Sequence, residues 1–576
     1  MIQSLNPANG KLLRSFDPLT PEALNAKLAL ASSAARTYPK ETLDQRIFWM
    51  RRLAALLEAD LEELAVTMTS EMGKTLVSAR AEVSKCAAVC RYYADNAARF
   101  LAPERIATDH SDSPEQKESP EQNDCYVRYD PLGVILAVMP WNFPLWQVFR
   151  FLAPALMAGN IGLLKHASNV PQCALAIEAL VRRAGFPRGV FQTLLIEARQ
   201  VEHLLNDPRV VAVTVTGSEA TGRAVAAQAG WLIKKSVLEL GGSDPFIVLP
   251  SANLGAAIEN AIKARTINNG QSCIAAKRFI VHDSIYTDFE KRFVARMADL
   301  RIGDPMLETT DIGPLATPQL VEDLLQQVTR ARESGGRVLT GGGRAFVEDG
   351  NLGNYFQPTV IAGVMRNAPI CQEEIFGPVA LLFRVSSLDD AIELANDTPF
   401  GLAASAWTSD DAERQRLAVE LQSGAVFLNA PVASDPRLPF GGIKRSGYGR
   451  ELSAIGMREF LNAKTVVVVE LAAETHPTPP DKSEAEPNAE LKLEPTPDSR
   501  SDKPSEFQHI ADQIRKFEPH KNSSPSADPN PPAPLEPEPV PAESIPPEPT
   551  PTQLKSQEPN KDGDAPPPDG SMLHLR

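Results

Sequence analysis

The sequence predicts an α/β protein whose folded part is followed by a proline-rich tail. Short apolar runs alternate with helical stretches through most of the chain, a pattern typical of a parallel sheet covered on both faces. The composition changes after Leu471, where 24 of the 50 prolines and 20 acidic against 10 basic side chains occupy the remaining residues. A length of 576 residues also indicates more than one domain.

The N-terminal part is expected to be helical from residue 21 to residue 100. Apolar residues recur there at spacings of three and four, through Met50, Leu53, Leu57 and Leu64. Residues 104–124 are polar, contain two prolines and show no period. They are predicted to form a loop or an insertion.

The central part predicts two consecutive α/β domains. A parallel sheet binds its ligands at the carboxyl ends of its strands, so we expect the first domain to bind a cofactor. The alternation resumes from Asp244 to Asn429, which predicts the second α/β domain. Strands are expected at 134–139, 161–165, 190–195, 210–216 and 237–240, and helices at 144–157, 171–183, 199–205 and 220–229. The predicted segments are residues 1–112 with 131–241 for the first domain, 242–430 for the second, and 113–130 with 431–471 for a smaller extension.

Within the extension, residues 464–471 (KTVVVVEL) are predicted to form an isolated strand. Such an edge strand could pair with another subunit, which predicts a homodimer or homotetramer.

The tail, residues 472–576, is expected to be a disordered, acidic, proline-rich segment, because it cannot bury enough apolar surface to offset its loss of entropy. One short stretch, 505–517, combines a capping box with an apolar face and ends before Pro519. It is either a transient helix or a docking helix for a protein partner.

Composition excludes several classes of function. A net charge of −15 and the lack of clustered positive charge argue against nucleic acid as a partner. We found neither a membrane span nor a signal peptide. The six cysteines form no disulfide framework, which favours the cytoplasm, and the scattered histidines predict no metal site.

Four motifs are candidates for chemistry. Cys273 in GQSC lies in a loop that could expose a reactive thiol, although a lone cysteine is more often a buried apolar residue. Glu239 in LELGG ends an apolar strand and is either a general base or a structural ion-pair partner.

Asn142, between the prolines of PWNFP, is either an oxyanion donor or a turn residue. The run from Gly217 and Ser218 to Gly222 opens a helix and suits a phosphate, although it is neither a Walker loop nor GxGxxG.

Taken in order, these motifs resemble the aldehyde dehydrogenase superfamily over about residues 4–470. The matching segments are PWNFP (140–144), LLKHAS (163–168), TGSEATG (216–222), LELGG (238–242), GQSC (270–273), EEIFGPV (373–379) and PFGG (439–442). The resemblance implies that the first domain is a Rossmann-like cofactor-binding domain, that residues 242–430 form an α/β catalytic domain, and that the smaller extension is a β segment for oligomerisation. The tail has no counterpart in this resemblance.

The resemblance implies a role for each motif. Cys273 would be the nucleophile that forms a thiohemiacetal and then a thioester, Asn142 would bind the oxyanion, and Glu239 would activate the hydrolytic water. The implied cofactor-binding residues are Trp141, Lys165, Ser168, Gly217, Ser218, Leu240, Glu374 and Phe376. The family needs no metal.

Ser168 favours NADP over NAD. Relatives that prefer NAD often carry Glu at this position, and that carboxylate repels a 2′-phosphate. A hydroxyl beside Lys165 instead offers the phosphate a donor and a positive charge.

Arg150 indicates the substrate. With Trp146 one turn earlier, it lies on the helix that passes beside the nucleophile, where it could bind a distal carboxylate or form a surface ion pair. Members that oxidise succinate semialdehyde to succinate carry Arg there. Animal-type members have a second Arg where this chain has Ile267, and Ser434 or Arg437 could replace it.

The sequence therefore supports three hypotheses of function. The first is NAD(P)-dependent oxidation of succinate semialdehyde, and the second is a broad-specificity or glutarate-semialdehyde dehydrogenase. The third is a scaffolding role carried by the tail.

Overall fold

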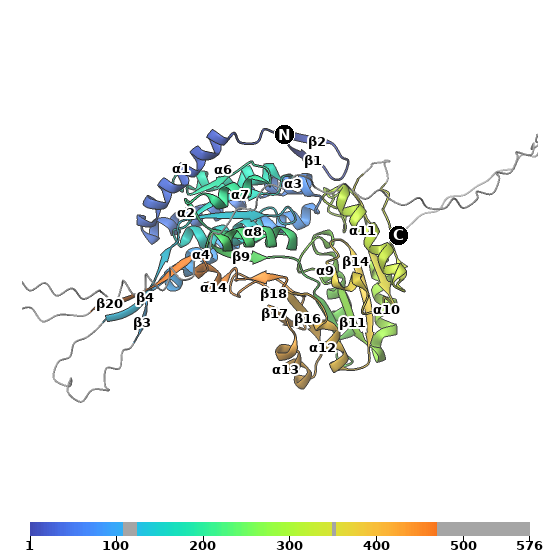
Figure 1. Ribbon diagram of the computed structural model, residues 1–576. Helices are drawn as coiled ribbons and strands as arrows, with labels where there is room; N and C mark the ends of the chain where they lie inside the picture. Colours follow the sequence, from blue (N-terminus) through green and yellow to red (C-terminus); the bar gives the residue numbers. More distant parts are fainter. Residues whose placement is uncertain (107–123, 348–352, 469–576) are drawn as a thin grey trace, which may run out of the picture. The chain divides into compact units, whose positions relative to one another are not determined.

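The computed structural model describes residues 1–106, 124–347 and 353–468 (Figure 1). The predicted tail and its candidate helix at 505–517 lie outside these residues. Within the described part, no helix is long and apolar enough to cross a membrane.

The first sheet carries most of the residues that the sequence predicts to bind a cofactor. Its strand order is β19-β9-β8-β5-β6-β7, and every neighbouring pair is parallel except β19 with β9. The strands are β5 (Val134–Met139), β6 (Ile161–His166), β7 (Phe191–Thr193), β8 (Val210–Thr216), β9 (Lys235–Glu239) and β19 (Gly447–Tyr448). The connecting helices are α5 (Trp146–Met157), α6 (Pro171–Ala184), α7 (Gln200–Asn206) and α8 (Glu219–Trp231). The expected alternation of strands and helices is confirmed here to within a few residues.

The expected helical region at 21–100 is divided into separate helices; the first contacts strands of this sheet, and the others pack on α5, α6 and one another. They are α1 (Pro21–Thr37), the 3-10 turn Tyr38–Lys40, α2 (Leu43–Ala59), α3 (Leu61–Met72) and α4 (Leu76–Leu101), preceded by the hairpin β1 (Ile2–Leu5) and β2 (Leu12–Phe16). Thr42 and Thr75 cap the starts of α2 and α4, and Gly73 ends α3 with a φ of 82°. Helix α4 packs against α2, α3 and α5, which places it beside the site.

The second sheet has the order β12-β13-β14-β11-β10-β16-β17, in which only β12 is antiparallel to its neighbour. Its strands are β10 (Pro245–Val248), β11 (Arg278–His282), β12 (Arg337–Thr340), β13 (Thr359–Ala362), β14 (Val379–Val385), β16 (Ala403–Trp407) and β17 (Ala425–Leu428). Successive residues of β11 face opposite sides, so Phe279 and Val281 join one apolar cluster and Ile280 joins the other.

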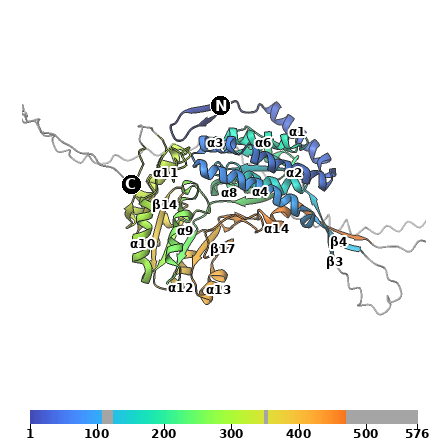
Figure 2. The same cartoon turned by 180° about the vertical axis from the view of Figure 1, so that it is seen from behind.

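Helices cover both faces of the second sheet (Figure 2). Helices α9 (Leu254–Thr266) and α10 (Asp283–Ala298) contribute to one apolar cluster; α11 (Pro318–Glu333), α12 (Leu388–Asn396) and α13 (Asp411–Glu420) contribute to the other. The shorter elements are 3-10 turns Ile267–Gly270 and Pro369–Gln372, the pair β15 (Phe400–Gly401) and β18 (Ile443–Lys444), and α14 (Ser453–Arg458).

A third, antiparallel sheet of order β20-β4-β3 projects from the larger sheets (Figure 1). Its strands are β3 (Glu104–Ile106), β4 (Asp124–Pro131) and β20 (Leu461–Val468). The expectation of an unbroken loop over 104–124 is wrong at both ends, because residues 104–106 and 124 pair in this sheet; a three-residue strand is too short to show alternation. The strand expected at 464–471 begins at Leu461, and residues 469–471 are not described.

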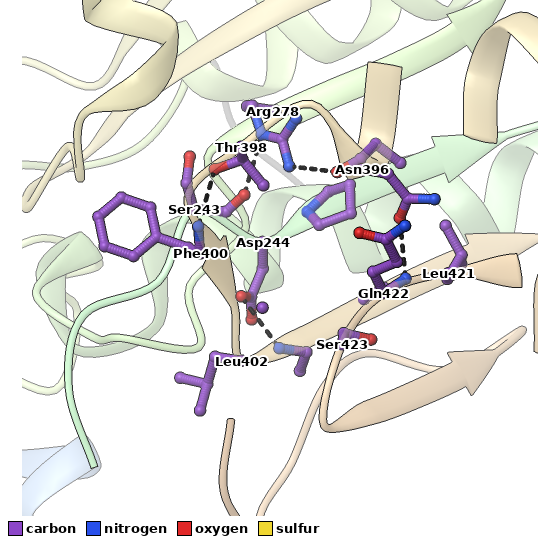
Figure 3. Close-up of a pocket in the computed structure, with 15 residues that line it drawn as sticks. Ser243, Asp244, Arg278, Asn396, Thr398, Phe400, Leu402, Leu421, Gln422 and Ser423 are labelled. Atoms are coloured by element: carbon purple, nitrogen blue, oxygen red, sulfur yellow. Dashed lines mark hydrogen bonds between the residues drawn. The ribbon is translucent and has the colours of Figure 1, made fainter. Parts of the chain in front are cut away.

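A polar network ties the second sheet together at a small cavity of about 10 Å³ (Figure 3). The buried Arg278 donates from Nε to the carbonyl of Ser243 at 2.9 Å and from Nη2 to the carbonyl of Ala395 at 2.8 Å. Asp244 accepts from the Ala403 N–H at 3.2 Å, and burial raises its pKa to about 7. Because this space is at most the size of a water molecule, the network joins β10, β11 and the end of α12 rather than binding a ligand.

Candidate active site

Two cavities of about 260 Å³ each meet at Cys273. The first is lined by the cofactor-side candidates Trp141, Asn142, Gly217, Ser218, Glu239, Leu240, Glu374 and Phe376. The second is lined by the substrate-side candidates Trp146, Arg150 and Ser434, together with Lys85, Ile267 and Phe440. A group bound in either cavity can therefore reach the same sulfur.

The loop that carries Cys273 is anchored on both sides. Before it, Asn268 and Asn269 adopt left-handed conformations with φ of 56° and 58°, which asparagine tolerates better than most residues. After it, the fully buried Lys277 donates from Nζ to the carbonyl oxygens of Ser272 at 2.9 Å and Cys273 at 2.6 Å. The two contacts hold the backbone of the nucleophile candidate in place.

The Asn142 amide is positioned from the same loop. Its Nδ2 donates to the carbonyl of Gln271 at 3.0 Å, while Asn268 Nδ2 donates to the carbonyl of Asn142 at 2.7 Å. A side-chain amide has two N–H groups, so the second remains to serve an oxyanion in the cavity that Asn142 and Cys273 both line.

The Cys273 thiol is protonated at neutral pH. Burial raises its pKa to about 12, and the positive charges of Lys277 and Arg150 only partly oppose this effect. Because the thiolate is the nucleophile, attack on a substrate needs a group that accepts the thiol proton.

Glu239 is suited to proton transfer. It is 2% exposed, and neither of its carboxylate oxygens has a hydrogen-bond partner among the described residues. Burial raises the pKa of this carboxyl well above its usual value, Arg150 lowers it and Glu451 raises it further. A β-carbon at Gly441, whose φ is +153°, would lie 2.5 Å from Glu239 Oε1, so the PFGG motif leaves room for the carboxylate.

Arg150 is held by a buried ion pair that the sequence did not reveal. Its Nε contacts Glu451, its Nη2 donates to Thr216 Oγ1 at 3.3 Å, and its guanidinium lies 4.4 Å from the Phe440 ring centroid. The expected alternative of a surface ion pair is wrong, because Arg150 is 3% exposed. A guanidinium has five N–H donors, so these contacts leave donors for a ligand in the cavity.

Lys85 is a substrate-side residue that sequence reasoning missed. Its Nζ donates to Ser434 Oγ at 2.7 Å and lies 4.1 Å from the Trp146 ring centroid. Arg437, the alternative to Ser434, lines neither cavity, because it is exposed and pairs with Asp435. The helical pattern of α4 alone gave no reason to single out Lys85.

Most of the cofactor-side candidates line the first cavity. Ser218 caps α8 by accepting from the Thr221 N–H at 3.3 Å, and Trp141 packs edge-to-face on Phe376 with centroids 5.8 Å apart. Glu374 accepts from the Gly242 N–H at 3.0 Å and lies 3.6 Å from Lys277 Nζ.

Lys165 and Ser168 line a separate cavity of about 330 Å³. Burial lowers the pKa of Lys165, and no carboxylate forms an ion pair with it within the described ranges. Glu197 shares the cavity but pairs with Arg199 at 2.7 Å. A lysine without a carboxylate partner beside a serine is an arrangement that suits an anion.

The described residues contain no group of three or more His, Cys, Asp or Glu side chains arranged to hold a metal ion.

Comparison with known proteins agrees with this arrangement. The aldehyde dehydrogenase family matches residues 1–466. The chain is 52% identical over 465 residues to succinate-semialdehyde dehydrogenase [NADP(+)] 1 of Mycobacterium tuberculosis, covering 81% of this chain and 99% of the relative. The same figures hold for a probable succinate-semialdehyde dehydrogenase [NADP(+)] of Synechocystis.

Solved structures give the same result. The chain is similar to succinic semialdehyde dehydrogenase from Streptococcus pyogenes in complex with NADP⁺, with a TM-score of 0.77, 37% identity and coverage of 82% of this chain and 100% of that one. The order of the motifs, the two cavities that meet at one cysteine and these matches lead to one conclusion: the chain belongs to the aldehyde dehydrogenase family.

Proposed function

We propose that this chain oxidises succinate semialdehyde to succinate with NADP⁺ as the oxidant. The observation that carries the proposal is the single cysteine shared by two cavities, of which one contains a buried carboxylate and the other buried or half-buried cations. The names of the relatives at 52% identity point to the same reaction.

Cys273 begins the reaction. Its sulfur adds to the aldehyde carbonyl to form a thiohemiacetal, and the thiol proton passes to a base. Asn142 Nδ2 and the Cys273 backbone N–H donate to the oxygen, which carries the developing negative charge. The contacts with Gln271 and Asn268 hold Asn142, and the contact from Lys277 holds the Cys273 backbone, which keeps both donors in position.

Glu239 completes the reaction. After oxidation the acyl group is a thioester on Cys273, and a water molecule must attack it. Glu239 removes a proton from that water, the carbon–sulfur bond breaks, and succinate leaves with the thiol restored. A carboxylate whose pKa is raised by burial is a stronger base than an exposed one.

The residues present fit a dinucleotide with a 2′-phosphate. Lys165 and Ser168 would hold the adenosine ribose and its phosphate, the start of α8 at Gly217 and Ser218 would face the pyrophosphate, and Glu374 and Phe376 would contact the nicotinamide ribose. Trp141 and Leu240 line the same cavity. When bound, NADP⁺ supplies the hydride acceptor for the oxidation.

The distal end of the substrate is assigned to the second cavity. Arg150 contributes positive charge and free N–H donors, Trp146 forms an apolar wall, and Ser434 supplies a hydroxyl. These groups favour an aldehyde that carries a carboxylate at its other end.

Steady-state kinetics with both cofactors test this function. The expected order of kcat/KM is succinate semialdehyde above glutarate semialdehyde above butanal, with NADP⁺ above NAD⁺. Equal kcat/KM values for succinate semialdehyde and butanal would favour a broad-specificity dehydrogenase. A higher kcat/KM for glutarate semialdehyde than for succinate semialdehyde would favour a glutarate-semialdehyde dehydrogenase.

We also propose a homodimer or homotetramer located in the cytoplasm. Strand β20 lies at the edge of its sheet with Val467 59% and Val468 44% exposed, which suits pairing with a second copy. All six cysteines are free, as in a reducing compartment. Size-exclusion chromatography with light scattering measures the oligomeric state.

A further inference from the structure

The substrate-side cavity contains a cation, Lys85, for which the described part of the chain provides no anionic partner. Lys85 lies on the face of α4 that also presents Ser78, Ala81 and Glu82 to this cavity, at the three- and four-residue spacing of one helix face. No carboxylate in residues 1–106, 124–347 or 353–468 forms an ion pair with Lys85 Nζ. Its polar contact is the Ser434 hydroxyl at 2.7 Å.

The neighbouring cations differ from Lys85 in this respect. Arg150 contacts Glu451, and the fully buried Lys74 contacts Glu82. Besides Lys74, Glu82 has two backbone partners, because it accepts from the N–H groups of Leu145 and Trp146 at 2.9 Å and 2.8 Å. A half-buried ammonium without a counter-ion is unfavourable, and an anion in the cavity would relieve that cost.

We infer that Lys85, together with Ser434, binds the carboxylate of the substrate and provides the second contact besides Arg150. Lys85 would donate to one carboxylate oxygen. The Ser434 hydroxyl accepts from Lys85, so its own hydrogen is free to donate to the other. The inference rests on the proposed function for the identity of the aldehyde, but requires only that the ligand carry a carboxylate.

Lys85 provides the second positive charge for the substrate carboxylate, in place of an arginine at position 267. Ile267 lines the same cavity and adds an apolar wall, while the positive charge comes from α4 on another wall. Trp146 lies against the ammonium at 4.1 Å and restricts where Nζ can point. The expected ligand class is therefore a short aldehyde with a terminal carboxylate.

Binding should depend on the protonation of Lys85. Burial is the main cause that lowers the pKa of Lys85 to about 8, and the positive charge of Arg150 lowers it further. The pKa is raised by contributions from Cys86, Glu82 and Asp435. The charged form exists below this pKa. The preference for a carboxylate-bearing aldehyde should therefore be full at neutral pH and decline as the pH rises through about 8.

The test compares Lys85→Met, Lys85→Arg and Arg91→Met in the full-length protein. Arg91 lies on the same helix, is outside the cavity and pairs with Glu58, so its variant controls for a lost charge. Lys85→Met should lower the ratio of kcat/KM for succinate semialdehyde to that for butanal about ten- to a hundredfold, mainly through KM. Lys85→Arg should restore most of the ratio and remove its decline above pH 8, whereas Arg91→Met should behave as the parent protein does.

Inhibition by succinate separates this inference from the proposed function. The inhibition constant of succinate against butanal oxidation reports the carboxylate site even if succinate semialdehyde is not the best substrate. Lys85→Met should raise this inhibition constant about ten- to a hundredfold, the same factor by which it lowers the kcat/KM ratio. Continued turnover of butanal by the variant shows that it folds. An unchanged ratio and an unchanged inhibition constant in Lys85→Met would overturn the inference.

Discussion

At the scale of single residues, the site joins groups whose ionisation is opposed by burial. Cys273 and Glu239 both have raised pKa values, and the charges near them come from Lys277, Arg150 and Glu451. Residues that form the thioester and hydrolyse it in separate steps should give different defects when replaced.

Substitution of Cys273 and Glu239 tests this division. Cys273→Ala should abolish turnover and the formation of NADPH, because no thiohemiacetal can form. Glu239→Gln should allow one rapid round of NADPH formation and then slow hydrolysis of the thioester, measured by stopped-flow absorbance at a stoichiometric enzyme concentration. A full steady-state rate in either variant would refute the assigned role.

Ser168 is the residue through which cofactor preference can be tested. Ser168→Glu would place a carboxylate beside Lys165, repel the 2′-phosphate and lower the ratio of kcat/KM for NADP⁺ to that for NAD⁺, by at least about tenfold for 1.4 kcal/mol of repulsion. Ser168→Ala removes the hydroxyl without adding charge and should lower the ratio less. If the glutamate variant keeps the parent ratio, cofactor selection lies elsewhere.

Arg150 needs a double variant, because Arg150→Leu alone would leave the buried Glu451 carboxyl without its partner. That loss costs about 3–5 kcal/mol in stability. Arg150→Leu with Glu451→Gln removes both charges. It should lower kcat/KM for succinate semialdehyde about ten- to a hundredfold relative to butanal, and Glu451→Gln alone is the control. Equal losses for the two aldehydes would assign Arg150 to supporting Glu239 rather than to binding the substrate.

The sequence predicted the candidate residues that belong to recognisable motifs but not the contacts that position them. Glu451 and Lys277 belong to no motif. The Arg150–Glu451 pair depends on tertiary packing, and the contacts of Lys277 with the Ser272 and Cys273 carbonyls depend on the local path of the loop. Lys85 was missed for a related reason: a lysine in an amphipathic helix is usually solvated, and only the neighbouring Trp146 and Ser434 show that this one faces a cavity.

At the scale of elements, agreement between sequence and structure was closest where strands are buried on both faces. The expected strands at 134–139 and 210–216 match β5 and β8 residue for residue, because continuous apolar runs between turn signals are distinctive. The helical region at 21–100 was less well resolved, since apolar periodicity continues across the breaks at Thr42 and Gly73. Strand β3 was missed because three residues carry no period.

The loop that contains PFGG gives a prediction at this scale. Gly441→Ala would place a methyl group 2.5 Å from Glu239 Oε1 at a φ of +153°, so the loop or the carboxylate must move. We expect slower thioester hydrolysis and a lower Tm, measured by burst kinetics and thermal unfolding. Gly10→Ala is a matched control, because Gly10 also has a positive φ but no atom lies within 4 Å of its added β-carbon. An unchanged burst and steady-state rate in Gly441→Ala would contradict this account of the glycine.

At the scale of the whole molecule, the proposed chemistry and cofactor binding use residues from the N-terminal hairpin to the segment before α14. The residues that line the two cavities at Cys273 run from Ser78 to Phe440, and the cavity with Lys165 and Ser168 adds residues from the N-terminus. The family match also ends at residue 466. From its proline-rich and acidic composition, we expect the chain beyond Leu471 to be dispensable for the site.

Truncation after Leu471 tests this separation. The shortened protein should keep the kcat, the KM for the aldehyde and the Tm of the full-length chain, because no residue assigned to chemistry or binding is lost. Both proteins should be measured at the same concentration, since oligomerisation makes apparent stability depend on concentration. Immobilised residues 472–576 provide the complementary experiment, in which retention of the truncated protein would show that the tail binds the catalytic part. Loss of activity or of the oligomeric state on truncation would show that the tail supports the assembly, and this result would contradict the prediction.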